Sequence, residues 1–191
     1  MMRLLTTLSL CLILAPGLFA QSQKDEISST LNAYFKLVEE KKVSEFLDYV
    51  HPKLIGMMGR AMFEQQYEAF FNAPNLDMTM ENIKADEISE VFAHDSGQFA
   101  LVKYSFKMTL VMKPDQDETA GNMVFETYKK QFGEENVSEK EKGTYIVNGH
   151  REMFACQQEG FEGWKVLDYE PGMKMILAQF IAAEVFTHFD K

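Results

Sequence analysis

Residues 98–113 of this chain, QFALVKYSFKMTLVMK, decide the fold. Apolar and polar side chains alternate along the stretch, and this period of two is typical of a β-strand that buries one face. The face predicted to be buried carries Ala100, Val102, Tyr104, Phe106, Met108, Leu110 and Met112. Lys103, Ser105 and Lys107 are expected on the opposite face. The stretch is long for a strand, so we expect it to bend around the rest of the domain.

Helical patterns come before this strand, and both helices and strands follow it. Residues 25–41 place Ile27, Leu31 and Phe35 on one face, as an amphipathic helix does. Ser44 is expected to cap a short helix over 45–50 that ends before Pro52, and residues 56–59 to form a flexible joint. Further helices are predicted over 60–71, 122–132 and 173–189, and further strands over 77–91, 144–156 and 164–169. The pattern predicts an α+β domain with N-terminal helices on a strongly curved, mainly antiparallel sheet, and a C-terminal helix.

Asn148-Gly149 interrupts the strand pattern of residues 144–156. The pair is typical of a two-residue hairpin turn, and it also fits a bulge within one long strand. The segment before it, 144–147, is short for an independent strand, which slightly favours the bulge.

The first twenty residues, MMRLLTTLSLCLILAPGLFA, have the pattern of an export signal. Arg3 precedes an apolar run over 4–14, and a small residue, Ala20, ends the segment. The run is too short for a membrane span, which needs about 20 apolar residues, so no stable membrane insertion is expected. Lipid attachment at Cys11 is the alternative, but Leu10 stands where a small residue is required. We expect a single domain over 21–191 that works in the periplasm or outside the cell.

The composition of the chain limits the classes of partner and of chemistry that we expect. The 191-residue chain has a formal net charge of −10, which repels phosphate backbones, so no nucleic-acid partner is expected. The four histidines are far apart and form no ligand pair, so we expect no metal and no cofactor. Cys156 is the one cysteine left after the export signal, and its strand position favours a buried thiol over a nucleophile. The 13 methionines suit either an adaptable ligand cavity or plain core packing.

Two stretches carry a family resemblance: LNAYFKLVEEKKVSEFLDYVHPKL at 31–54 and HREMFACQQEGFEGWKVLDYEP at 150–171. With helices first, long strands after them and Gly-Trp-Lys-Val-Leu-Asp closing the sheet, the chain resembles the nuclear transport factor 2-like (cystatin-like) superfamily, and within it an exported branch. The resemblance covers nearly all of residues 25–170. It implies a cone-shaped sheet wrapped against helices, with a cavity open at the wide end. The helix over 122–132 and the long C-terminal segment depart from the minimal pattern.

The resemblance also implies where chemistry would lie. Enzymes of that superfamily, such as ketosteroid isomerases and polyketide cyclases, pair a carboxylate or histidine with a tyrosine in the cavity, since proton transfer needs a base and a donor for the enolate oxygen. The candidates for such roles are Tyr34, Tyr104, His150, Glu152 and Asp168. The simpler interpretation is that Tyr34 and Tyr104 are core aromatics. Candidate ligand-binding residues are Tyr104, Phe106, Met108, Phe154 and Trp164.

Three functions remain open at the level of sequence. The leading hypothesis is an exported, non-catalytic domain that binds a small apolar or amphipathic ligand, or a protein partner. The alternative is a lyase or isomerase of the ketosteroid isomerase type, and the third is an envelope interaction module without a pocket. The C-terminal segment, 173–189, is apolar on most sides, so we expect it to be a lid over the cavity or, alternatively, a homodimer contact.

Overall fold

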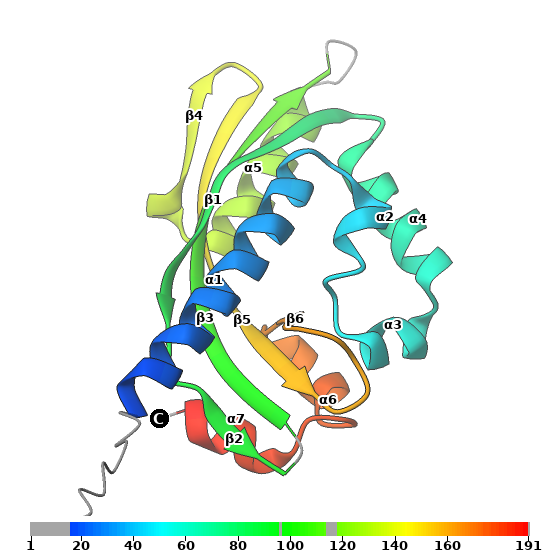
Figure 1. Ribbon diagram of the computed structural model, residues 1–191. Helices are drawn as coiled ribbons and strands as arrows, with labels where there is room; N and C mark the ends of the chain where they lie inside the picture. Colours follow the sequence, from blue (N-terminus) through cyan, green and yellow to red (C-terminus); the bar gives the residue numbers. More distant parts are fainter. Residues whose placement is uncertain (1–15, 96, 114–117, 191) are drawn as a thin grey trace, which may run out of the picture.

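The computed structural model describes residues 16–95, 97–113 and 118–190, which form an α+β arrangement of helices around one antiparallel sheet (Figure 1). The helices are α1 (Pro16–Glu39), α2 (Val43–Phe46), α3 (Pro52–Met58), α4 (Arg60–Phe71), α5 (Glu118–Phe132), α6 (Lys174–Leu177) and α7 (Ala183–Phe189), with 3-10 turns at η1 (Glu134–Asn136) and η2 (Pro171–Met173). The strands are β1 (Leu76–Ile88), β2 (Phe92–His94), β3 (Gly97–Met112), β4 (Val137–Glu141), β5 (Thr144–Gln158) and β6 (Lys165–Asp168). None of the helices in these ranges is long and apolar enough to cross a membrane.

Within the described residues the sheet does not close on itself. Its strands follow the order β1-β3-β5-β4, while β2 pairs with the end of β3 and β6 with the end of β5. β3 and β5 pair without a register shift from Gly97–Gln158 to Val111–Thr144. These two central strands therefore determine which residues of the sheet share a face.

The alternation predicted for residues 98–113 is confirmed by β3. Ala100, Val102 and Leu110 are fully buried, whereas Lys103 is exposed. The hairpin predicted as one alternative for Asn148-Gly149 is wrong, and the single long strand of the other alternative is confirmed without its bulge, because β5 runs through the pair in unbroken register with Gly149 opposite Phe106. The glycine is needed for space: a Cβ atom there would lie 2.2 Å from Cζ of Phe106.

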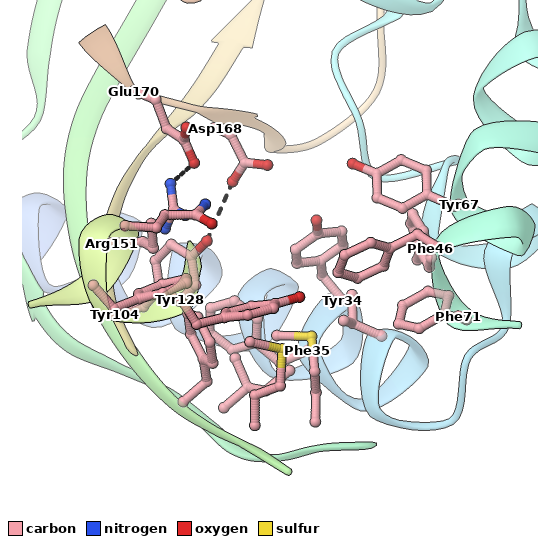
Figure 2. A pocket seen from close by; sticks show the side chains of 18 residues that line it. Tyr34, Phe35, Phe46, Tyr67, Phe71, Tyr104, Tyr128, Arg151, Asp168 and Glu170 are labelled. Atoms are coloured by element: carbon pink, nitrogen blue, oxygen red, sulfur yellow. Dashed lines mark hydrogen bonds and ion pairs between the residues drawn. The ribbon is translucent and has the colours of Figure 1, made fainter. Parts of the chain in front are cut away.

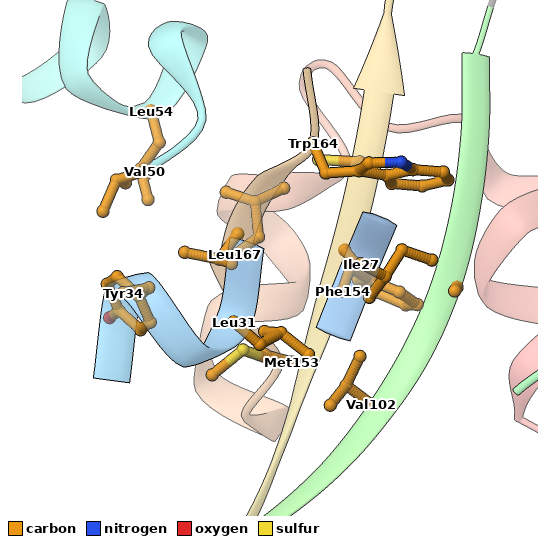
Figure 3. Close-up of a cluster of buried hydrophobic side chains, with 14 of the residues drawn as sticks. Ile27, Leu31, Tyr34, Val50, Leu54, Val102, Met153, Phe154, Trp164 and Leu167 are labelled. Carbon is orange, nitrogen blue, oxygen red and sulfur yellow. The ribbon is translucent and has the colours of Figure 1, made fainter. Parts of the chain in front are cut away.

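Helix α1 covers one face of the sheet, and the C-terminal segment covers the other. Phe35 of α1 stacks on Tyr104 of β3 with ring centroids 5.5 Å apart. On the opposite face, Phe186 of α7 lies 5.9 Å from Phe154 of β5, again between centroids. Residues 153–156 of β5 are all buried because helices pack on both sides of them. Figure 3 shows Phe154 and its neighbours in this core.

The helices after α1 differ from the sequence prediction at their ends. The helix expected over 45–50 is the short α2, whose N-cap is Lys42, and the Ser44 hydroxyl instead donates a hydrogen bond to Glu64 at 3.0 Å. Pro52 does not mark an end; it is the first residue of α3, where its missing N–H costs nothing. Residues 56–58, expected to be part of a flexible joint, belong to this helix. The predicted helix over 60–71 is confirmed by α4.

The C-terminal segment is not one helix. It forms η2, α6 and α7, separated by a non-helical stretch before Ala183. Leu177, Ile181 and Val185 are nevertheless buried, so the apolar character of the segment is used for packing against its own chain. Strand β4 was not predicted, because its sequence, VSEKE, carries one buried residue and four exposed ones.

Candidate functional site

A cavity of about 190 Å³ lies between the helices and the face of the sheet that α1 covers. It is situated where the main core cluster, built on α1, meets a second cluster built under α5. Its apolar lining is Phe35, Val38, Phe46, Phe70, Phe71, Met80, Ile83, Phe106, Met108 and Phe132. An apolar cavity of about 150 Å³ accommodates benzene, so this space suits a small ring or a short chain.

One end of the cavity is polar (Figure 2). Asp168 Oδ1 accepts a hydrogen bond from the hydroxyl of Tyr104 at 3.3 Å. Tyr34 from α1 and Tyr67 from α4 line the same space, and Figure 2 shows the second oxygen of Asp168 directed toward the side on which they lie. Tyr128, Gln131 and Glu170 complete the polar lining, together with Arg151.

Strand register brings these side chains together. Arg151 of β5 is the direct partner of Tyr104 on β3, so both point to the same face. Asp168 of β6 is paired with Met153, which lies two residues after Arg151 and therefore also faces the cavity side. The sheet thus delivers a carboxylate, a guanidinium and a phenol to one end of the cavity.

Arg151 is held in place by two interactions. It forms an ion pair with Glu170, and its guanidinium carbon lies 4.8 Å from the centre of the Phe132 ring. The ion pair offsets its charge, and the ring contact adds a cation–π attraction.

Burial dominates the electrostatics of the polar end. It raises the pKa of Asp168 from the ordinary 3.8, while the hydrogen bond from Tyr104 and the charge of Arg151 act in the opposite direction. Burial, followed by the charge of Asp168, raises the pKa of Tyr34 and of Tyr104 well above the ordinary 10.0, and the same two causes raise that of Tyr67. All three phenols therefore keep their protons and can donate hydrogen bonds.

The structure brings together some of the residues predicted to form a site and separates others. Tyr34, Tyr104 and Asp168 converge on the cavity, and Phe106 and Met108 line it. The other four predicted residues do not: His150, Glu152, Phe154 and Trp164 are absent from the lining.

Strand register explains why His150, Glu152 and Phe154 do not line the cavity. His150 and Glu152 oppose Ser105 and Lys103, so they point to the face away from the cavity. Phe154 continues that same series along β5 and is buried under α7 instead. Trp164 is buried in the main core, where its indole N–H donates to Glu26 at 3.3 Å. The proposed grouping of Phe154 with Tyr104 was therefore wrong by one position in the alternation.

Two predicted features elsewhere have a clear outcome. The Cys156 thiol is fully buried, burial raises its pKa, and Sγ donates to the carbonyl oxygen of Lys165 at 3.5 Å, as expected for a structural cysteine. The C-terminal segment contributes no described residue to the cavity lining, so the expectation of a lid is wrong for this cavity. Its role as a homodimer contact stays a prediction.

The sequence alone did not indicate Arg151, Glu170 or Tyr67 as site residues, although all three line the cavity. Helical periodicity could have placed Tyr67 on the inner face of its helix. Only the β3–β5 register places Arg151 on the cavity face of the sheet. Among the residues described, no cluster of three or more His, Cys, Asp or Glu side chains could hold a metal ion.

No protein-family model matches this chain, and neither a curated protein nor a solved structure matches it.

Proposed function

We propose that this domain binds a small amphipathic molecule in the cavity after export. The observation that carries the proposal is the division of the cavity into an apolar body and one polar end at Asp168. Small-molecule sites have this composition, since apolar walls supply affinity and a few polar groups fix orientation. Met80 and Met108 in the walls can adapt their shape to an irregular guest.

The same features support a relationship to the nuclear transport factor 2-like superfamily. An open antiparallel sheet, helices packed on it and a cavity between helices and sheet are the elements that a cone of that type requires. We extend the proposal to this fold relationship, which the resemblance of residues 31–54 and 150–171 suggested.

Methionine methyl groups provide the test. Met80 and Met108 line the cavity, whereas Met123 and Met175 are 67% and 84% exposed elsewhere. In a nuclear magnetic resonance titration with phenethyl alcohol, we expect saturable shifts of the Met80 and Met108 methyl signals and none of the other two. Shifts confined to the exposed methionines, or no saturable shift, would contradict binding in the cavity.

A matched pair of variants tests whether the probe binds inside the cavity. Val38→Phe introduces a ring into the cavity wall and is expected to abolish the shifts. Val111→Phe makes the same change at a side chain that is 40% exposed and does not line the cavity, so binding should persist.

The second candidate is an enzyme that moves a proton next to a carbonyl group. It is favoured by one observation: a carboxyl group with a raised pKa faces phenols that remain protonated. In this hypothesis Asp168 takes a proton from the carbon, Tyr34 or Tyr67 donates a hydrogen bond to the enolate oxygen, and Asp168 returns the proton.

Hydrogen exchange tests the catalytic hypothesis without knowledge of the substrate. Cyclohexanone in deuterated water should exchange its α-hydrogens faster with the protein than with buffer alone. Asp168→Asn should abolish the acceleration, and Glu152→Gln, on the other face of the sheet, should not. Exchange at the buffer rate would leave binding as the function.

A further inference from the structure

Around Asp168 the polar end of the cavity offers hydrogen-bond acceptors as well as donors. Asp168 has one oxygen bonded to Tyr104, and among the described residues no hydrogen bond is formed by its second oxygen or by the hydroxyls of Tyr34 and Tyr67. A carboxylate is an acceptor only, and a phenol can accept as well as donate. These three groups face one space, so a guest that reaches it meets oxygen atoms from three directions.

The ionisable side chains at this end include one base, Arg151, and two acids, Asp168 and Glu170. Arg151 is the one cationic side chain among the described residues that line the cavity, and it is already paired with Glu170. The Phe132 ring holds the other side of its guanidinium group. The charge of Arg151 also acts on Asp168, but among the described residues Asp168 forms no ion pair, so its carboxylate is the group left to pair with a ligand cation.

We propose that the cavity selects apolar amines, with a protonated amino group that contacts Asp168 and a body that lies among the aromatic walls. The inference rests on the proposed binding function and names its ligand class. An ammonium group carries three donors and no acceptor, which matches the Asp168 carboxylate and the hydroxyls of Tyr34 and Tyr67. The faces of nearby aromatic rings add cation–π attraction. An anionic ligand would place like charges together at Asp168 and is disfavoured.

Three probes with one body and different head groups separate the possibilities. Phenethylamine, phenethyl alcohol and hydrocinnamate are titrated against the full chain, and the cavity methionine signals are followed. We expect the amine to bind about tenfold more tightly than the alcohol, since hydrogen bonds to a charged group are the stronger ones. Hydrocinnamate is expected to bind most weakly. An amine no tighter than the alcohol, or hydrocinnamate as tight as either, overturns the amine assignment and leaves the binding function intact. No saturable binding of any probe overturns both.

Variants test whether the Asp168 carboxylate is the group that binds the ammonium group of the ligand. Asp168→Asn keeps a partner for Tyr104 but removes the charge, so the amine and the alcohol should bind equally. Glu152→Gln removes a carboxylate from the opposite face of the sheet and should keep the preference. Tyr67→Phe keeps the ring and loses one acceptor, and should weaken amine binding severalfold even if Asp168→Asn fails to fold. An amine preference that persists in folded Asp168→Asn overturns the proposal, and so does unchanged amine binding by Tyr67→Phe if Asp168→Asn does not fold.

Discussion

Gly149 shows how one residue can allow two strands to pair. The Phe106 ring occupies the space above it, and a Cβ atom would come within 2.2 Å of that ring. We expect Gly149→Ala to lower the free energy of unfolding by about 1–3 kcal/mol, because the buried ring must move. Urea unfolding monitored by circular dichroism measures the loss.

A double-mutant cycle tests whether the ring is the cause. Phe106→Ala alone should cost about 3–5 kcal/mol as a truncation of a buried aromatic residue. In the Phe106→Ala background, Gly149→Ala should add almost nothing, since the two effects share one contact. Additive losses would show that Gly149 is needed for another reason.

The burial of His51 predicts that the stability of the fold depends on pH. It is fully buried; its Nδ1 accepts the backbone N–H of Lys53 at 3.1 Å, so the proton is on Nε2, which donates to Oε1 of Gln158 at 2.8 Å. Burial lowers its pKa from the ordinary 6.5. The unfolded chain therefore binds a proton more readily, and the stabilising contribution present above pH 6.5 is lost as the pH falls through the folded pKa.

The prediction is a fall in unfolding free energy as the pH is lowered below about 6.5. His51→Gln should flatten this dependence, and His150→Gln, at an exposed position, should leave it as it is. Unfolding curves at several pH values provide the comparison. A pH dependence that survives in His51→Gln would assign it to other groups.

At the scale of elements, the C-terminal segment acts as a cover for the sheet. Phe186 of α7 is 3% exposed and packs against Phe154 and Tyr169. Phe186→Ala should cost about 3–5 kcal/mol and increase the binding of a hydrophobic dye, because the outer face of β5 loses its cover. Met175→Ala, at a side chain 84% exposed, should have little effect on either measurement. Equal stability of the two variants would mean that the segment is dispensable.

Periodicity predicted the long elements well and the short ones poorly. Residues 98–113 and 60–71 carry enough repeats to define a strand and a helix, and both are present. The predicted helix over 173–189 was wrong because burial by neighbours makes a segment apolar whether or not it is a continuous helix. The prediction that Pro52 ends a helix is wrong because proline suits the first turn of a helix equally well.

The candidate site depends on the whole molecule, which limits what sequence could predict. Tyr34, Tyr104 and Asp168 were predicted as candidates, and the fold brings them together. Arg151 and Phe154 could not be assigned to a face, because α5 and β4 separate β3 from β5 in the sequence and no tight hairpin sets the register. A shift of one residue exchanges the two faces of a strand.

The amino-terminal end yields a prediction about the whole chain. Residues 1–15 of the predicted export signal lie outside the described residues, and 16–20 belong to α1. Ile27 is the first buried residue among the described side chains of α1. We predict cleavage after Ala20 and expect a chain that starts at Gln21 to keep its stability within about 0.5 kcal/mol. Amino-terminal sequencing of exported material and an unfolding curve check both parts. A mature chain that still starts at Met1 would contradict the export prediction.

The irregular course of β1 has a consequence for encounters between copies of the protein. A straight edge strand is a template on which another molecule can add a strand. Within the described residues β1 pairs with β3 alone, yet its register shifts after Glu81 and again after Ala85, and the backbone N–H of Ile83 already donates to Glu39 at 3.0 Å. An incoming strand finds a bent row of groups with one donor taken. The sheet can therefore remain open at this edge in a crowded compartment without seeding fibres.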